Sequence, residues 1–289
     1  KTSPDYESPS DNGGNNIYDI TVTASDGTLT NSKAVAITVT NVNETPTDIA
    51  LSSSSVAENQ SSGTTVGTFS TTDPDTGNTF TYTLVSGTGD TDNASFTIES
   101  GVLKTGASFD YETKNSYAIR VRSTDQGGLY TEKTFTITVT NVNEAPTVTS
   151  DSTATFAENG TGTVYTTTGS DPDAGTTLSY SISGTDASLF NIDSSTGAIT
   201  FKVAPNYESP SDSGGNNVYD ITVTASDGSL TNSKAVAITV SNVNETPTDI
   251  ALSSSSVAEN QSSGTTIGTL STTDPDAGNT FTYTLVSGT

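Results

Sequence analysis

The sequence of 289 residues contains no cysteine, no histidine, no methionine and no tryptophan. The lack of cysteine excludes a disulfide framework and thiol chemistry, and the lack of histidine removes the most common general base of enzymes. Basic residues are scarce as well, because nine Lys and Arg stand against 33 Asp and Glu, which gives a formal net charge of −24. A protein of this charge repels nucleic acid and anionic membranes and attracts cations.

Long apolar segments are also missing. No run approaches the roughly 20 residues of a membrane helix, so we expect no membrane insertion in this part of the chain. No signal peptide is visible, and any export signal or anchor is expected outside it. The hydrophobic content of 30% is low, but Tyr82 and Leu84, and likewise Ile137 and Val139, alternate with threonines. This alternation is typical of half-buried strands and argues against disorder.

The chain repeats itself. Residues 1–88 align with residues 202–289 with only ten differing positions, so the repeating unit is 201 residues long. Within it, the stretch Asn-Val-Asn-Glu occurs at 41–44, 141–144 and 242–245, each time two residues before a proline. A period of about a hundred residues with a proline at each boundary indicates tandem domains.

We therefore predict complete domains at 46–145 and 146–245, with the C-terminal half of a domain at 1–45 and the N-terminal half of another at 246–289. Near-identity across two domains suggests a longer array of alternating copies. Alternatively, the two halves complete each other between molecules. This is less favourable, because they would lack the equivalent of residues 186–201, which is expected to form two strands around a turn of the core.

Each complete domain is predicted to be all-β. In the first domain the expected strands lie near 48–56, 65–71, 79–85, 95–98, 101–105, 115–124 and 132–141. Turn signals such as Ser62-Gly63 separate them. Seven short strands in about 100 residues are typical of a Greek-key sandwich. No segment has a sustained helical period, so the predicted fold is a tandem series of seven-stranded Greek-key β-sandwiches, nearly free of helix.

Acidic residues recur at fixed places in each domain. In the first they lie in Ala57-Glu58-Asn59, Asp73-Pro74-Asp75, Phe109-Asp110-Tyr111-Glu112, Asp125-Gln126-Gly127 and the boundary stretch 141–146. This order and spacing resembles the cadherin repeat, nearly motif by motif, and the second domain and both halves are similar. The resemblance implies that calcium is bound at the boundary between successive domains, typically as three ions.

The resemblance also implies the ligands, which are acids and asparagines of these motifs. For the first boundary they are Asp5, Glu7, Asn41, Asn43, Glu44, Asp73, Asp75 and Asp125. For the second they are Glu58, Asp110, Glu112, Asn141, Asn143, Glu144, Asp171, Asp173 and Asp227. For the third they are Glu158, Asn206, Glu208, Asn242, Asn244, Glu245, Asp274 and Asp276.

The residue types fit calcium on chemical grounds, because this ion takes six to eight hard oxygen ligands and no soft ligand is present for zinc or copper. The alternative is that Asp-Pro-Asp serves only as a turn. Two departures from the family pattern suggest weaker binding. The boundary stretch is one residue shorter than the family's Asp-x-Asn-Asp-Asn, and Asn206 stands where Asp5 and Asp110 stand elsewhere.

The function expected from the sequence is structural. We expect calcium-stiffened extender repeats of a long secreted or cell-surface protein, such as a bacterial adhesin or a biofilm matrix fibre, with calcium and further copies of the repeat as partners. The alternative is that the repeats bind a partner directly or associate laterally into a filament. An enzyme is disfavoured, since strand-like alternation would send Asp110 and Glu112 to the same side without making a substrate cleft.

Overall fold

The computed structural model describes residues 2–287. Among these residues the only helices are two 3₁₀ turns of three residues each, η1 (Asn93–Ser95) and η2 (Ala187–Leu189). All other regular structure is β, as predicted. The chain divides into two compact units, residues 1–142 and 143–289, and each is described by itself.

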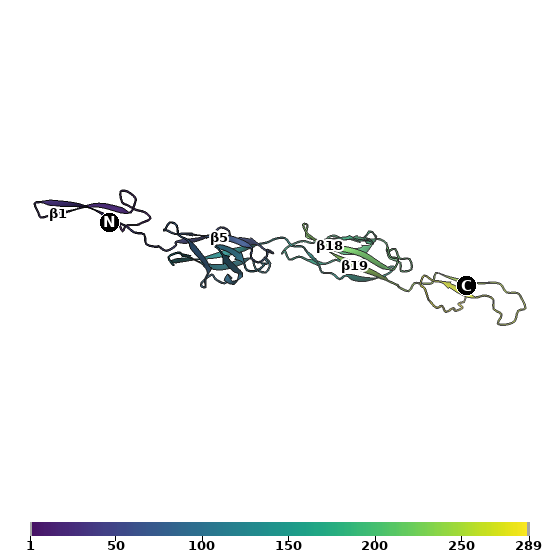
Figure 1. Ribbon diagram of the computed structural model, residues 1–289. Coiled ribbons are helices and arrows are strands. Elements are labelled where there is room, and N and C mark those ends of the chain that lie inside the picture. The colour runs from purple at the N-terminus through teal and green to yellow at the C-terminus, as the bar shows by residue number, and fades with distance from the viewer. Residues whose placement is uncertain (1, 288–289) are drawn as a thin grey trace. The chain divides into compact units, whose positions relative to one another are not determined.

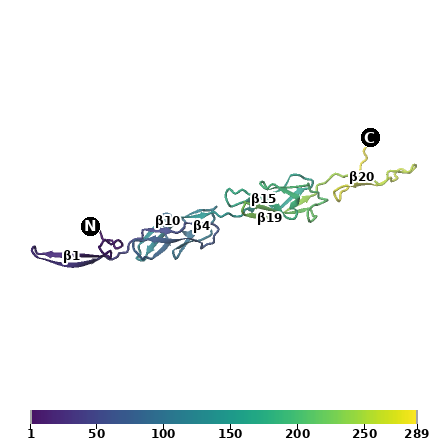
Figure 2. The ribbon, with the colours of Figure 1, turned by 90° about the horizontal axis from the view of Figure 1, so that it is seen from above.

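The first unit contains a sandwich of two four-stranded sheets. One sheet has the order β3 (Asp48–Leu51), β5 (Thr65–Thr72), β8 (Val102–Thr105) and β7 (Phe96–Glu99). The other has the order β4 (Ser55–Ala57), β10 (Tyr130–Thr140), β9 (Ser116–Asp125) and β6 (Phe80–Leu84). All pairs are antiparallel except β4 with β10, which lie side by side in Figure 2. Such non-consecutive neighbours give the Greek-key connectivity.

The expected strand at 48–56 is wrong in one detail, because it breaks into β3 and β4 and passes from one sheet to the other. The break lies against Gly67 of β5. A Cβ atom on Gly67 would lie 2.5 Å from the backbone oxygen of Ser53. The crossing chain therefore needs a residue without a side chain at position 67. Counted together, β3 and β4 are the first of seven strands.

The core of this sandwich comes from alternate residues of facing strands. Ile49 and Leu103 of one sheet, and Ile119, Val121 and Ile137 of the other, are completely buried. Residues between them point outward, which is the period of two read from the sequence. Burial of each such side chain contributes about 1.5–3 kcal/mol, so the sandwich is a rigid support for the loops at its ends.

The second unit has the same plan. Its four-stranded sheet has the order β12 (Thr153–Ala157), β19 (Thr231–Ser241), β18 (Val218–Ser226) and β15 (Ser179–Ser183), with β18 beside β19 in Figure 1. Opposite lie β13 (Thr163–Thr166), β17 (Ala198–Phe201) and β16 (Phe190–Ile192), and the short pair β11 (Thr147–Val148) and β14 (Gly169–Ser170). The two strands expected within 186–201 are confirmed as β16 and β17.

The ends of the chain form two-stranded sheets. They consist of β1 (Ile17–Ser25) with β2 (Thr30–Thr38), and β20 (Asp249–Leu252) with β21 (Leu270–Thr273). Ile20 and Val22 of β1 are 43% and 52% exposed, whereas the matching Ile221 and Val223 of β18 are 2% and 0% exposed. The hairpin thus presents to solvent the side chains that the second sandwich uses as core.

Candidate metal centre

A buried glutamate follows the first strand of each complete sandwich. Glu58 is completely buried, and its two carboxylate oxygens accept hydrogen bonds from the backbone N–H groups of Val142 (2.7 Å) and Tyr111 (2.8 Å). Glu158 is 2% exposed and makes the same pair of contacts with Val243 and Tyr207. Each oxygen keeps a lone pair for a further partner, so the glutamate is both anchored and able to bind a cation.

In the first unit, Glu58 lies in a group with Asp110 and Glu112, whose carboxylates each place an oxygen within 4.8 Å of the others. The Thr113 backbone N–H and hydroxyl both donate to Asp110, at 2.9 Å. These hydrogen bonds lower the pKa of Asp110 and favour its charged form. Asn141 donates to Glu112 at 3.3 Å. Three predicted ligands of the second boundary are thereby brought together.

The second unit holds a larger group. Glu158, Glu208, Glu245 and Asp276 each offer an oxygen within 4.8 Å of the others. Burial, and then the charges of Glu158 and Glu245, raise the pKa of Glu208. The Glu245 N–H donates to Asp276 at 2.6 Å, and Asn242 donates to Glu208 at 3.0 Å. Four carboxylates at this spacing repel each other unless a cation lies between them.

A third group, in the first unit, consists of Glu7, Glu44 and Asp75. Asp75 accepts hydrogen bonds from the Asn41 side chain and from the Glu44 N–H, both at 2.8 Å. Burial, followed by the charges of Glu7 and Asp75, raises the pKa of Glu44. The boundary stretch and the Asp-Pro-Asp loop therefore share one acidic site.

The Asp-Pro-Asp segments are turns, but the turn uses only one of the two carboxylate oxygens of its first aspartate. Oδ1 of Asp73, Asp171 and Asp274 accepts the backbone N–H two residues later, at 2.9–3.0 Å. Oδ2 of the same three residues is buried and has no hydrogen-bond partner in the part of the chain that the structure describes. A buried carboxylate oxygen without a partner is costly. A cation would satisfy it, so these residues fit a metal and not the turn alone.

Boundary asparagines position a further aspartate in each unit. Asn43 donates to Asp125 at 2.9 Å, and Asn143 donates to Asp227 at 2.7 Å. Burial opposes ionisation of Asp125, but the Asn43 bond and backbone N–H groups outweigh it and lower the pKa. The Asn143 bond is the main cause of the lowered pKa of Asp227. A Cβ on Gly127 would lie 2.5 Å from Asn43, so this glycine leaves room for the contact.

The remaining predicted residues take part in local contacts. Asp5 accepts the N–H groups of Glu7 and Ser8. The Glu144 N–H donates to Asp173 at 3.0 Å, within the second unit. Asn244 donates to the backbone of Glu245. The residues predicted for the second boundary thus divide between the units, with Glu58, Asp110, Glu112 and Asn141 in the first and Asn143, Glu144, Asp171, Asp173 and Asp227 in the second.

Two asparagines next to these groups were missed by the sequence analysis. Asn159 donates to Glu245 at 2.6 Å, and Asn279 donates to Asp274 at 3.0 Å. Asn159 directly follows Glu158 and has a positive φ of 58°, like Asn59 and Asn260 after their glutamates. The recurrence of Glu-Asn after each first strand was a signal in the sequence, because asparagine tolerates this left-handed conformation.

Comparisons with known proteins agree with this arrangement. Residues 52–140 match the Cadherin domain family model. Human Protocadherin Fat 4 is 31% identical over 235 residues, covering 77% of this chain and 4% of that protein. Cadherin-18 of cattle is 31% identical over 294 residues, covering 90% of this chain and 36% of that protein. The chain thus spans a small part of these curated relatives.

Solved structures show the same fold. The crystal structure of mouse Cadherin-23 EC22-24 has a TM-score of 0.55 and 25% identity, covering 84% of this chain and 78% of that one. Protocadherin Gamma B7 extracellular domains 1–4 give a TM-score of 0.60 at 20% identity, covering 96% of this chain and 71% of that one. Residues 52–140 therefore match a cadherin domain, and the chain has the all-β fold of cadherin repeats.

Proposed function

We propose that the acidic groups bind calcium and that the chain forms calcium-stiffened extender repeats of a long adhesin or matrix fibre. The observation that carries this proposal is the group of Glu158, Glu208, Glu245 and Asp276, whose oxygens lie within 4.8 Å of one another. The buried, unpartnered Oδ2 of Asp274 supports it independently. The ligands of the ion are the carboxylates and asparagine oxygens named for each boundary above.

Calcium is favoured over other metals by the donor set. All candidate ligands are hard oxygens on several different loops, which suits the high coordination number and flexible geometry of calcium. Magnesium requires a more regular octahedron and keeps most of its water. The ion would neutralise repulsion among carboxylates that the fold brings together, and it would tie each boundary stretch to the adjacent sandwich.

We further propose domain boundaries at 45/46, 145/146 and 245/246, with incomplete domains at both ends. The near-identical 201-residue copies favour a long array whose role is to extend the protein.

Extracellular calcium modules have Kd values of about 10⁻⁴–10⁻³ M, so such sites fill outside the cell. The cadherin relatives support a cell-surface or secreted location. They are animal proteins, so the proposal of a giant bacterial adhesin comes from the repeat pattern alone. Among the described residues, no helix is long and apolar enough to cross a membrane.

Direct partner binding is the second candidate function, and one surface of the first sandwich favours it. Arg120 and Arg122 of β9 both bind Glu132 of β10, with shortest distances of 2.6 Å. The Arg122 guanidinium lies 4.0 Å from the centre of the Tyr130 ring. The matching positions of the second sandwich are small hydroxyl residues, including the hydrogen-bonded pair of Thr224 with Ser233. One repeat type thus carries a basic and aromatic patch that the other lacks.

Small-angle scattering tests the extender function. We expect the maximum dimension in millimolar calcium to exceed that in chelator, because unneutralised carboxylates then repel and the boundaries bend. Magnesium at the same ionic strength is the control. One maximum dimension under all three conditions would contradict stiffening by calcium.

A further inference from the structure

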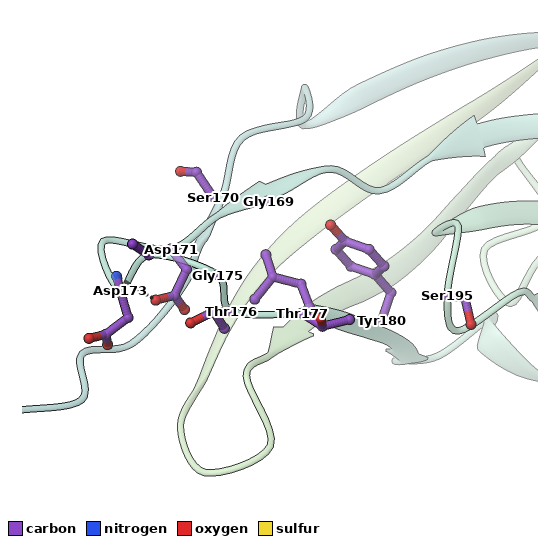
Figure 3. A pocket seen from close by; sticks show the side chains of 11 residues that line it. Gly169, Ser170, Asp171, Asp173, Gly175, Thr176, Thr177, Tyr180 and Ser195 are labelled. Carbon is purple, nitrogen blue, oxygen red and sulfur yellow. Dashed lines mark hydrogen bonds between the residues drawn. The ribbon is translucent and has the colours of Figure 1, made fainter.

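The second sandwich has a hollow of about 600 Å³ at the end of β14, between the following loop and β15. Figure 3 shows its side chains, with Asp171 and Asp173 at one end, Ser195 at the other and Tyr180 between them. Gly169 and Leu178 also line it. The two aspartates belong to the candidate metal centre, but the rest of the lining has no part in it.

The hollow results from smaller side chains than those of the first sandwich. Tyr180 pairs with Ala225 in the sheet, as Tyr82 pairs with Ser123, which sets the alignment of the two sandwiches. Four positions around this tyrosine are reduced in size. In the second sandwich Thr167 replaces Phe69 of the first, Gly169 replaces Thr71, Leu178 replaces Phe80, and Ala225 replaces Ser123.

Because of these replacements, Tyr180 lacks the contacts that Tyr82 makes in the first sandwich. In the first sandwich, Thr71 donates to the Tyr82 hydroxyl at 3.0 Å, and the Phe69 ring stacks on Tyr82 with centroids 5.3 Å apart. Tyr180 has neither neighbour, and its hydroxyl makes no hydrogen bond within the described residues. Tyr180 is half-buried and lines the hollow. A tyrosine in this state offers an apolar face and a free polar group to a ligand.

The remaining lining limits the ligand class. It carries the hydroxyls of Ser170, Thr176, Thr177 and Ser195 and no Lys or Arg. In a chain of net charge −24, phosphate, sulfate and carboxylate ligands are repelled. The hollow therefore suits a neutral molecule with many hydroxyl groups and an apolar face. A saccharide unit has both, since its hydroxyls pair with side-chain oxygens and its C–H face packs on an aromatic ring.

We propose that this hollow is a binding site for a neutral saccharide unit, present in one repeat type and absent from the other. Tyr180 supplies the aromatic face and a hydroxyl, Thr176 and Ser195 supply hydrogen bonds, and Gly169 lies in the wall, where a Cβ would be 3.0 Å from Leu178 and 3.1 Å from the Thr147 oxygen. The affinity of a single open site is expected to be weak. An array of copies would add avidity, because a long glycan can engage several sites at once.

The test is calorimetric titration of the 289-residue chain with neutral trisaccharides of glucose, mannose and galactose, in the presence of calcium. We expect at least one to bind. Tyr180→Phe should weaken that binding roughly two- to twelvefold, which is the effect of one hydrogen bond. Gly169→Thr, which restores the first sandwich's residue, should abolish it.

Tyr82→Phe in the first sandwich is the matched control and should leave the affinity unchanged. Circular dichroism verifies that each variant is folded. If Gly169→Thr does not fold, Tyr180→Phe alone still tests the proposal. The proposal is overturned if none of the trisaccharides binds, or if folded Tyr180→Phe or folded Gly169→Thr binds with the affinity of the unaltered chain. It is also overturned if spermidine, a cationic probe, displaces the trisaccharide and binds more tightly than it.

Discussion

The side-chain oxygen of Asn206 accepts a hydrogen bond of 2.7 Å from the backbone N–H of Ser209. Asp5 and Asp110 make the equivalent bond to the residue three positions later, at 3.0 and 2.9 Å. An aspartate offers a cation two oxygens and a negative charge, whereas Asn206 offers one neutral oxygen and an NH₂ group, which cannot be a ligand. Asn206 can therefore bind an ion only through the remaining lone pair of its one oxygen, and it adds no charge to the site.

From this difference we predict that Asn206→Asp tightens calcium binding by the group of Glu158, Glu208 and their neighbours, by roughly tenfold, because calcium affinity follows the number of charged ligands. Asp110→Asn should weaken binding by the group of Glu58 and Glu112 to a similar degree. Calcium titration of each variant measures the change. If Asp110→Asn has the affinity of the unaltered chain, this position is not a ligand.

Glu58 is expected to have a structural role that Glu112 lacks. Glu58→Ala leaves the N–H groups of Tyr111 and Val142 without their acceptor, at a cost of about 1–3 kcal/mol even without calcium. Hydrogen exchange at these two amides, in chelator, should accelerate accordingly. Glu112→Ala is the matched control, because this side chain is exposed, and it should change only calcium affinity. Equal exchange rates in the two variants would refute the distinction.

Two acids, Glu44 and Glu208, lower the stability of the calcium-free protein at neutral pH, because burial and neighbouring acids raise their pKa values. A raised pKa in the folded state means that the folded protein binds the proton more tightly than the unfolded chain. Stability from these groups is present below the unfolded-state pKa and is lost as pH rises through the folded-state pKa. We expect these two groups to lower the melting temperature of the chelated protein at pH 7 relative to just above pH 4. Acids with lowered pKa values, such as Asp110, Asp125 and Asp227, contribute in the opposite direction.

Glu44→Gln and Glu208→Gln together should reduce this difference, since the neutral side chains neither titrate nor repel. Calcium should reduce it as well by stabilising the charged forms, with about 1.4 kcal/mol per site at ten times Kd. If the chelated double variant and the chelated unaltered chain change equally in melting temperature between these two pH values, the raised pKa values of Glu44 and Glu208 do not contribute to stability.

The fold could largely be predicted from the sequence, because apolar residues such as Ile119, Val121, Ile137 and Val139 alternate cleanly and all point to the core. The division of the first strand could not, since it depends on the approach of Ser53 to Gly67, which lies 14 residues away. Local periodicity contains no information about such a contact.

The acidic motifs could be found from their order and repetition, and the structure brings Glu58, Asp110 and Glu112 together. The sequence could not reveal that the two oxygens of one carboxylate have different contacts. Asp73 uses one oxygen for its turn and keeps the other buried without a partner. The amide contacts of Asn159 and Asn279 also depend on three-dimensional proximity and not on spacing.

Calcium stoichiometry measured against a chelator tests the central claim most directly. Equilibrium dialysis of the metal-stripped chain should give saturable binding of at least one ion for each of the three carboxylate groups, with magnesium competing poorly. The triple variant Asp73→Asn, Asp171→Asn, Asp274→Asn, which neutralises the buried unpartnered carboxylates, should bind fewer ions or bind them more weakly. A chain that binds no calcium at millimolar concentration, or a triple variant with an unchanged isotherm, would contradict the account.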